Sequence, residues 1–396
     1  MEEATTYKLG DISTMKYGKL PPKYINEGNY PIWSGYRYVG KCNEFNCNKG
    51  DIIIVARGVG GTGDVKIAKE DCYLTNLSIQ VKLDKNICQP EYFYYSYLLS
   101  NLKYLDSGSA QSQITIEDLK RLEVTLPPLE QQHKITDILK SIDEKIELNR
   151  QINDNLEQQA KALYKSWFID FEPFTDSEFI DSEIGLIPKE LTVDHIGNLS
   201  HRIESGRRPK GGASDSGVPS VGAENIKKLG YYDFSKTKYI PADFANNITR
   251  GKVNGYELLI YKDGGKPGYF LPSFTIFGDG FPYDTFYINE HVFILDLKND
   301  QYNAFAYFYM QTDYIMTQLN ALGGKAAIPG INTSDVESLP IISYSHPKVQ
   351  EFGYYAYDVV KTILRNSREN ARLAKLRDAL LPKLMSGELK INEIDC

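Results

Sequence analysis

The sequence has few cysteines and lacks any apolar run long enough to span a membrane. Its five cysteines are an odd number without a CxxC pair, which is typical of a reducing compartment and argues against a zinc site. No apolar segment approaches the roughly 20 residues that a membrane-spanning helix needs. The N-terminal MEEATTYK also lacks the features of a signal peptide. We therefore expect a cytoplasmic chain without a metal site.

A net positive charge and the common catalytic motifs are absent too. The formal net charge is −7 at pH 7, so binding to nucleic acid must depend on local basic surface. The glycine loop at 58–63 is followed by Asp64-Val65, where a phosphate-binding loop needs Lys and then Ser or Thr. There is no dinucleotide-binding glycine motif, no amino-methyltransferase motif, no nuclease carboxylate–lysine cluster and no metal-ligand spacing among the histidines. We therefore expect no catalytic residues in this chain.

A long amphipathic stretch at 126–172 is the most regular feature of the sequence. Prolines at 127, 128 and 173 bound a helix of about 38 residues, or roughly 55 Å. Its apolar residues recur at steps of three and four, the pattern of one stripe along a helix. They are Ile135, Ile138, Leu139, Ile142, Ile146, Ile152, Leu156, Ala160, Leu163 and Trp167. So narrow a stripe needs a partner helix to cover it.

A second copy of this stretch lies 217 residues later, near the end of the chain. The offset maps Leu156 onto Leu373 and holds without a gap over about 50 residues. It also maps Asn149 onto Asn366, and both fall on a core position of the heptad pattern. An isolated asparagine in an apolar seam fixes the register of a coiled coil. We therefore expect the two helices to pair with each other. The alternative is two unrelated amphipathic helices, each packed on its own domain.

The segments before each helix resemble one another in the order of their predicted elements. Each has a basic loop with glycines, a buried strand run, a second loop and a strand of alternating apolar residues. The strands are expected at 51–55 and 77–83 in the first copy, and at 257–261 and 292–297 in the second. Helices are expected at 92–102, 115–122 and 304–319, and an acidic linker at 175–190.

The predicted fold class is α+β, with two mixed α/β domains and two long helices. The helices form an antiparallel coiled coil with an internal pseudo-two-fold repeat, which holds the two domains at opposite ends. The predicted division is a first domain at 1–126, the first helix at 127–172, a linker at 173–190, a second domain at 191–345, and the second helix with its tail at 346–396.

Three short segments carry a resemblance to a known family. They are LPPLEQQHKITDIL at 126–139, SEIGLIPKE at 182–190 and LRDALLPKLMSGELKI at 376–391. With these segments in this order, the chain resembles the specificity subunit of type I restriction–modification systems over essentially all of its 396 residues. The second copy departs from the pattern, because Ser345-His346-Pro347-Lys348-Val349-Gln350 stands in place of PPLEQQ. The entry to its helix is therefore expected to differ.

The resemblance implies a non-catalytic role in host defence. Each target-recognition domain would read half of a split, asymmetric site in double-stranded DNA. The helices would space the domains, dock two modification (methyltransferase) subunits and help recruit restriction–translocase subunits. No cofactor is expected in this chain: S-adenosylmethionine would belong to the methyltransferase, and ATP and Mg to the restriction subunit. From the residues alone, a coiled-coil scaffold with two domains for a non-DNA ligand is the alternative, and an enzyme with an unrecognised site is a third possibility.

Polar and basic loop residues are the candidates for DNA contact. Arginine and lysine suit phosphates and guanine edges, and asparagine and glutamine suit adenine edges. The candidates in the first domain are Lys16, Lys19, Lys23, Arg37, Arg57, Ser109, Gln111 and Gln113. Those in the second are Arg207, Arg208, Lys210, Asn225, Lys262, Lys266 and Lys325. For the lysines, a solvated surface without a ligand is the alternative. Asn149 and Asn366 are predicted to set the register of the coiled coil.

Overall fold

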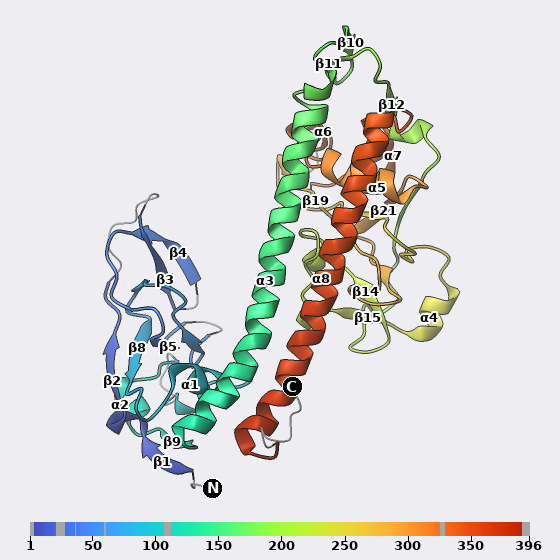
Figure 1. Ribbon diagram of the computed structural model, residues 1–396. Helices are drawn as coiled ribbons and strands as arrows, with labels where there is room; N and C mark the ends of the chain where they lie inside the picture. Colours follow the sequence, from blue (N-terminus) through green and yellow to red (C-terminus); the bar gives the residue numbers. More distant parts are fainter. Residues whose placement is uncertain are drawn as a thin grey trace. The chain divides into compact units, whose positions relative to one another are not determined.

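The computed structural model of the protein describes residues 4–20, 28–35, 37–58, 61–106, 112–324 and 329–389. It divides into two compact units, Met1–Glu144 with Leu373–Cys396, and Lys145–Arg372. Each unit contains one mixed domain and part of both long helices (Figure 1), so the predicted α+β fold class is confirmed. Among the described residues, no helix is both long enough and apolar enough to cross a bilayer.

The first domain is built on a four-stranded antiparallel sheet beside a three-stranded sheet. The four strands are, in order across the sheet, β2 (Ser13–Tyr17), β8 (Ser78–Leu83), β5 (Ile52–Val55) and β6 (Val65–Ile67). The three are β4 (Arg37–Cys42), β3 (Tyr30–Ser34) and β7 (Tyr73–Leu74), and β3 and β7 run parallel. All four side chains of β5 are buried, because an apolar run without alternation must be covered on both faces.

Shorter elements close the first domain. β1 (Thr5–Lys8) pairs with β9 (Glu123–Leu126), and the short helices are η1 (Leu9–Asp11), α1 (Pro90–Ser96), η2 (Lys103–Leu105) and α2 (Ile116–Lys120). Thr115 caps α2 in a capping box with Asp118, which satisfies two backbone N–H groups at the helix start. The helix predicted at 92–102 is shorter than expected, since α1 ends at Ser96.

The second domain repeats this plan. Its four-stranded sheet has the order β13 (Arg202–Ser205), β21 (Val292–Asp296), β16 (Leu258–Tyr261) and β19 (Ser273–Ile276). Its three-stranded sheet has the order β15 (Lys238–Ile240), β14 (Val218–Val221) and β20 (Tyr287–Ile288), and β14 and β20 run parallel. β12 (Val193–His195) pairs with β22 (Pro340–Ile342), and β17 (Gly265–Lys266) with β18 (Tyr269–Phe270). The same pairing pattern therefore occurs in both domains.

The helices and the connecting segment of the second unit differ from expectation. The single helix predicted at 304–319 is wrong: α5 (Asp300–Tyr309) and α6 (Asp313–Gly323) are separate, because Thr312 caps a new helix start. The acidic segment at 175–190 contains the hairpin β10 (Phe179–Ser182) and β11 (Gly185–Pro188). The remaining short helices are η3 (Glu172–Phe174), η4 (Ile196–Asn198), η5 (Ala223–Asn225), η6 (Phe234–Lys236), α4 (Ala242–Asn247) and α7 (Thr333–Glu337).

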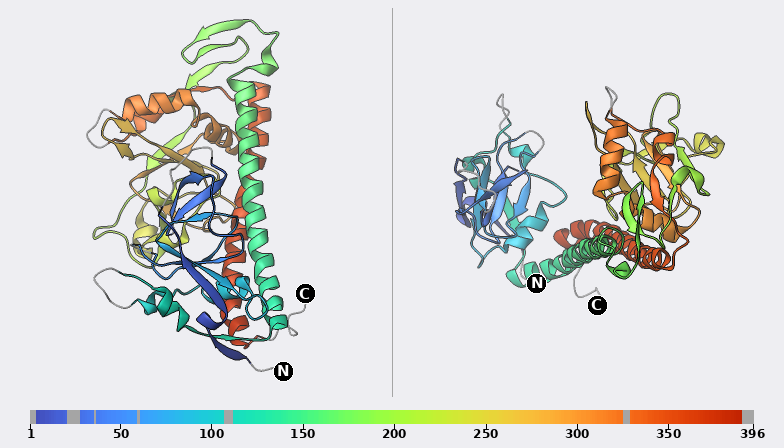
Figure 2. Two further views of the ribbon diagram at one scale, coloured as in Figure 1. Left: turned by 90° about the vertical axis from the view of Figure 1, so that its left-hand side faces the viewer. Right: turned by 90° about the horizontal axis from the view of Figure 1, so that it is seen from above.

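The two long helices, α3 (Leu129–Phe168) and α8 (Pro347–Ser386), have 40 residues each. They run side by side in opposite directions (Figures 1 and 2). Within the first unit, the Arg377 guanidinium binds the Asp143 carboxylate at 2.7 Å. Within the second, Phe352 on α8 packs its ring against Trp167 on α3 at a centroid distance of 6.4 Å. Residue numbers of the contacts therefore increase along α3 while they decrease along α8, which confirms the predicted antiparallel pair.

The buried stripe of α3 differs in its second half from the expected one. Ile152 is 39% exposed, whereas Tyr164 and Phe168 are buried, because the aromatic core of the second unit covers their side of the helix. The helix entries also differ, as expected. Buried Gln132 donates hydrogen bonds to backbone carbonyls near the start of α3, whereas the matched residue in α8 is buried, apolar Val349.

Candidate nucleic-acid interface

A turn at 289–291 in the second domain follows the parallel strands β14 and β20. Val221 lies beside Ile288 in this pair, and the Asn289 N–H extends it by donating to the Val221 carbonyl at 2.9 Å. Parallel strands end at the same edge of a sheet, so the loops that follow them meet there, as in the ligand crevices of open α/β sheets.

Three loops of the second domain are joined to this turn or to one another by backbone contacts. The contacts are hydrogen bonds from Gly206 N–H to the Asn289 carbonyl (3.1 Å) and from Lys262 N–H to the His291 carbonyl (3.1 Å), and a bridge between Asp263 and Gly330. A Cβ at Gly206 would lie 1.7 Å from the Ile288 carbonyl oxygen, so this approach requires glycine. The basic loops 206–212 and 262–268 are therefore neighbours.

Ion pairs and side-chain hydrogen bonds also link the same loops and the turn. The Lys262 ammonium lies 3.0 Å from the Asp263 carboxylate, which accepts a hydrogen bond from His291 Nδ1–H at 2.8 Å. His291 Nε2 is 3.3 Å from Glu290 Oε1, which also binds the Arg208 guanidinium at 2.8 Å. Burial raises the pKa of the neighbouring Tyr261 hydroxyl, and the negative charge of Asp263 adds to this effect. These contacts hold the two basic loops in fixed positions.

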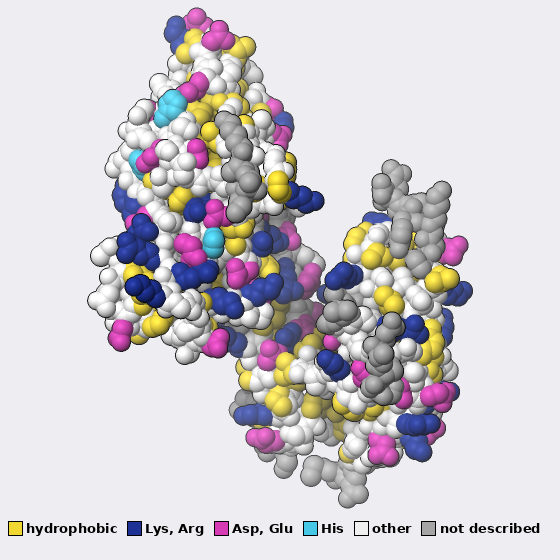
Figure 3. All heavy atoms as spheres, turned by 180° about the vertical axis from the view of Figure 1, so that it is seen from behind, with side chains coloured by type: hydrophobic (Ala, Val, Ile, Leu, Met, Phe, Trp, Pro, Cys, Tyr) yellow, Lys and Arg dark blue, Asp and Glu magenta, His cyan; other side chains and the backbone are white. Residues whose placement is uncertain are grey.

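A pocket with a cavity volume of about 280 Å³ opens beside this turn. It is lined by charged, polar and apolar residues from the segment 207–213, from the carboxyl end of β14 and the residues after it, from β15 and from the turn. They are Arg207, Arg208, Pro209, Ala213, Ser220, Gly222, Ala223, Glu224, Lys238, Ile240, Asn289 and His291. Figure 3 shows Lys and Arg side chains gathered on one face of the second domain, with Asp and Glu among them.

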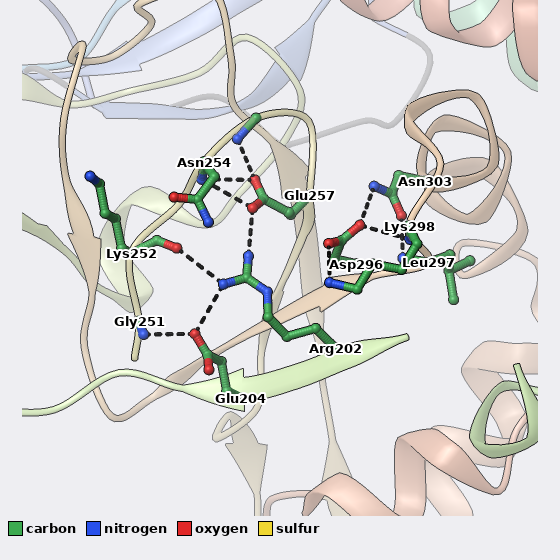
Figure 4. Close-up of polar contacts among 11 residues, drawn as sticks. Arg202, Glu204, Gly251, Lys252, Asn254, Glu257, Asp296, Leu297, Lys298 and Asn303 are labelled. Carbon is green, nitrogen blue, oxygen red and sulfur yellow. Dashed lines mark hydrogen bonds and ion pairs between the residues drawn. The ribbon is translucent and has the colours of Figure 1, made fainter. Parts of the chain in front are cut away.

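A buried carboxylate fixes a further loop, at 250–255, next to Gly206. Glu257 is only 4% exposed and accepts hydrogen bonds from the backbone N–H groups of Asn254 (3.0 Å) and Gly255 (2.7 Å). The Arg202 guanidinium bridges Glu257 (2.5 Å) and Glu204 (3.2 Å), and Glu204 accepts from the Gly251 N–H at 2.8 Å (Figure 4). A paired buried ion network of this kind is costly to break. It therefore gives the loop a defined conformation.

The first domain holds its loops in the same way. β3 and β7 are the parallel pair, with Trp33 beside Leu74, and the Thr75 N–H donates to the Trp33 carbonyl at 3.0 Å. The Ala56 N–H donates to the Leu77 carbonyl at 2.9 Å, as Lys262 does to His291. The turn at 75–77 is thus the counterpart of the turn at 289–291.

These matched hydrogen bonds pair individual positions of the two domains. The Ile114 N–H donates to the Ala56 carbonyl (3.0 Å), and the Ile331 N–H donates to the Lys262 carbonyl (3.0 Å). The next residue along each loop forms a bridge, Arg57 to Gln113 in the first domain and Asp263 to Gly330 in the second. Arg57 and Asp263 therefore occupy equivalent positions and have opposite charges.

Comparisons with known proteins agree with this architecture. A family model described as "Type I restriction modification DNA specificity domain" matches residues 1–158. The type I restriction enzyme MjaIX specificity subunit of Methanocaldococcus jannaschii is 28% identical over 389 residues, which cover 94% of this chain and 84% of that protein. The chain is thus similar, over nearly its whole length, to type I restriction–modification specificity subunits.

Further relatives cover most of the chain as well. The HindI specificity subunit of Haemophilus influenzae is 26% identical and matches 81% of this chain and 82% of its own. The crystal structure of the specificity subunit from M. genitalium superposes with a TM-score of 0.58 at 18% identity and covers 96% of both chains. This likeness shows the shared fold. The two mixed domains are called the first and second target-recognition domains below, after the specificity subunits to which the chain is similar.

The predicted contact residues of the first target-recognition domain lie on two strands and at the loop junctions. Lys16 on β2, Lys19 after it and Arg37 on β4 are exposed, and Arg57 and Gln113 are half-buried. The Nε of Arg57 is buried and has no hydrogen-bond partner among the described residues. The bridge between Arg57 and Gln113 brings two of the candidates together. Lys23, Ser109 and Gln111 lie outside the described residues.

In the second target-recognition domain, most candidates lie on the two joined loops. Arg207, Arg208 and Lys210 are exposed on the first loop and Lys266 on the second, and Lys262 is half-buried. Lys325 lies outside the described residues. The prediction that Asn225 contacts DNA is wrong, because Asn225 is 1% exposed and its side chain accepts a hydrogen bond from the Asp233 N–H at 2.8 Å.

Several residues near these loops were not found from the sequence. Lys238 and Asn289 line the pocket, His291 links two loops, and Arg250 and Lys252 are exposed on the loop fixed by Glu257. None of these residues lies in a sequence motif that would indicate a binding site. A search for polar residues directly after each buried strand run would have found Asn289, which follows β20.

A polar layer lies within the helix pair of the second unit. The Asn149 amide donates to Asn370 (2.9 Å) and Glu369 (2.7 Å), and the Asn366 amide donates to Asn153 (2.8 Å). Asn149 and Asn366 thus do not face each other, and each bonds to an asparagine close to the other one. The 217-residue offset relates Asn149 to Asn366 and Asn153 to Asn370, so it maps the pair Asn149–Asn370 onto the pair Asn366–Asn153. The pseudo-two-fold axis of the repeat therefore passes between the two pairs.

No group of three or more His, Cys, Asp and Glu residues able to hold a metal ion occurs in the described part of the chain. The described cysteines, Cys42, Cys47, Cys72 and Cys88, are free and buried. The loops carry cations and amides, together with the paired carboxylates of Asp263 and Glu290. These groups suit phosphate oxygens and base edges.

Proposed function

We propose that each target-recognition domain reads one half of a bipartite, asymmetric DNA site, as the non-catalytic recognition part of a type I restriction–modification complex. One observation supports this most strongly. Both domains join their loops by the same backbone hydrogen bonds but carry different side chains at matched positions, such as Arg57 and Asp263. A common frame with different donors and acceptors suits two readers of different sequences.

The helix pair has two proposed roles, to space the domains and to dock two methyltransferase subunits. Restriction–translocase subunits join the same assembly. The chemistry belongs to these partners: S-adenosylmethionine to the methyltransferase, which flips out the target base, and ATP and Mg to the restriction subunit. Since the substrate is DNA of the cell or of an invader, the role is carried out in the cytoplasm.

Exchange of one domain tests the proposal. Residues 7–125 are replaced by the first domain of another specificity subunit, and sites methylated by the assembled complex are mapped by sequencing. We expect only one half of the methylated site to change, and the reciprocal exchange of 191–345 should change only the other half. A change in both halves after one exchange would contradict independent reading.

The chain without partners is the matched control. It is expected to transfer no labelled methyl group to DNA, and methyl transfer by the purified chain alone would contradict the non-catalytic role. A scaffold for a non-DNA ligand, the second candidate, predicts no salt-dependent DNA affinity. Titration of DNA at several salt concentrations separates the two.

Insertion of one heptad at matched places in α3 and α8 tests the spacing role. The insertion keeps the seam in register and lengthens the pair by about 10 Å, or roughly three base pairs at 3.4 Å each. The far half-site is then also rotated by about 100°, so affinity should fall even at the best new spacer. An unchanged preferred spacer, measured on a library of methylated sites, would show that the helices only dock partners.

A further inference from the structure

The pocket at the carboxyl ends of β14 and β20 has an unequal balance of charge. Arg207 comes from the loop after β13, and Lys238 from β15, and neither forms an ion pair within the described part of the chain. Arg208 is paired with Glu290, and Glu224 is the one carboxylate among the described residues that line the pocket. Two unpaired cations against one carboxylate leave a single positive charge. This matches the single negative charge of a phosphodiester.

The pocket also offers an amide donor at its base. The side-chain amide oxygen of Asn289, Oδ1, is fixed because it accepts a hydrogen bond from the His291 backbone N–H at 3.0 Å. Its Nδ2 donates no hydrogen bond within the described residues. A Cβ at Gly222 would lie 2.6 Å from this Nδ2, so the glycine leaves the amide uncovered. The amide is therefore held in place with its N–H groups free for a ligand.

At the equivalent positions of the first domain, the polar side chains form a hydrogen bond with each other. Thr75 and Ser34 correspond there to Asn289 and Gly222, because each comes directly after the last paired residues of the parallel strands, which are Trp33 with Leu74 and Val221 with Ile288. The Thr75 hydroxyl donates to the Ser34 hydroxyl at 3.2 Å. The open, cationic arrangement is thus a feature of the second domain and not a general consequence of the repeated fold.

The lining favours an anion over a base. None of the described residues that line the pocket is Phe, Tyr or Trp, whereas single bases stack on aromatic side chains in their protein sites. Arginine, lysine and amide N–H groups are the usual partners of phosphate oxygens. A phosphate group therefore fits these residues better than a base does.

We propose that this pocket binds one phosphodiester of the DNA backbone, with Arg207 and Lys238 as its charged ligands and the Asn289 amide as a neutral donor. The inference rests on the proposed DNA recognition and deepens it, since it names the group that the pocket takes. A free phosphate ion offers the same oxygen atoms, and the test below separates the two sources.

The salt dependence of DNA binding tests whether both cations hold the same phosphate. Each neutralised phosphate contributes about −0.9 to the slope of log K against log salt concentration. Arg207→Ala and Lys238→Ala should each lower the slope by up to about 0.9, and the double variant by about 0.9 rather than twice that value. At a fourfold rise in salt, the double variant should lose about 3.5-fold less affinity than the wild type.

The measurement uses the full chain assembled with its modification subunits and two fluorescent duplexes. One duplex carries the mapped methylation site and the other an unrelated sequence. We expect the same loss of affinity on both, because a phosphate contact carries no sequence information. Lys238→Arg and Arg207→Lys should restore most of the binding. Lys189→Ala, which removes an exposed lysine paired with Glu178 on the β10–β11 hairpin, is the matched control and should keep the wild-type slope.

Three results would overturn the proposal. A double variant whose slope falls by about 1.8 would assign the cations to two separate phosphates. A loss confined to the specific duplex would assign them to a base edge. Saturable binding of inorganic phosphate to the wild type but not to the double variant, with DNA slopes unchanged, would identify a free phosphate site. Failure of the proposed function looks different, since the wild type itself would then show no salt-dependent DNA binding.

Discussion

The two target-recognition domains differ where their loops meet, although the backbone there is the same. In both, a turn after a parallel strand pair accepts the same backbone hydrogen bonds. The side chains on this frame are Arg57 and Leu77 in the first domain, and Asp263 and His291 in the second. The difference teaches that the fold supplies fixed positions, while single substitutions at those positions change charge and hydrogen-bonding character without altering the frame.

The two ends of the helix pair show a second contrast. In the first unit Arg377 binds Asp143, which also accepts a hydrogen bond from the Tyr95 hydroxyl at 2.8 Å. The 217-residue offset maps this ion pair onto Val360 and Ala160, which are both buried in the second unit. The helices are thus repeats in sequence, but each end is adapted to the domain that packs against it.

The largest expected effect is the loss of stability when a core side chain is removed at one end of the helix pair. Phe352→Ala removes a fully buried ring that contacts Phe168 and Phe305, and should destabilise the second unit by about 3–5 kcal/mol. The matched change in the first unit, Ile135→Ala, should cost about 2–5 kcal/mol. Amide hydrogen exchange should show each loss in its own unit. Equal losses in both units from either variant would show that the units unfold together.

A smaller effect is expected from the ion pair that only one end possesses. Arg377→Ala leaves Asp143 without its cation and should cost about 1–3 kcal/mol, since both side chains are largely but not fully buried. The double variant Asp143→Val with Arg377→Ala copies the pair found at the other end and should be less destabilised than Arg377→Ala. The quantity to measure is the free energy of unfolding in a double-mutant cycle. Additive losses would mean that the two residues do not act as a pair.

The next effect in size is on base-pair discrimination, when Arg57 or Asp263, the matched residues of opposite charge, is replaced. Arg57→Ala should reduce discrimination at one base pair of the first half-site by about 1–3 kcal/mol, as expected for a bidentate contact with guanine. Arg57→Lys should not restore it, because lysine cannot reproduce the planar fork. Asp263→Ala should leave the first half-site unchanged. Competition binding on a set of single-base variants measures these effects, and uniform weakening by Arg57→Ala would indicate a phosphate contact instead.

The smallest effect concerns the asparagine layer, which both halves of the repeat share. Replacing Asn149, Asn153, Asn366 and Asn370 together with leucine should strengthen the helix pairing but loosen its register, so that the complex methylates a broader range of spacers. Replacing Asn149 and Asn366 alone should stabilise less, because it removes the bonds of Asn153 and Asn370 and leaves their amides without those partners. Spacer libraries and thermal unfolding test both variants. An unchanged spacer range in the four-residue variant would show that the layer does not set the register.

Much of the helical architecture could be predicted, because it depends on local periodicity. Steps of three and four, the prolines at the helix ends and a constant 217-residue offset indicate two similar helices that need each other. The buried strand run at 51–55 and the short helix that begins near residue 115 were equally visible. The register within the pair was not, since Asn149 bonds to Asn370 rather than to its repeat counterpart Asn366, and facing positions in an antiparallel pair depend on where both helices begin and end.

By itself, then, the sequence determined the helix pair, the order of the two domains and the family that the chain resembles. Only the tertiary structure decided which loop residues share a surface. Arg57 meets Gln113, and Lys262 meets the turn at 289–291, because strand pairing joins segments that are far apart in the chain. The same pairing buries Asn225 and opens the pocket at Asn289. Burial and hydrogen-bond partners are set by non-local packing, so residue type alone does not separate a DNA contact from a structural amide.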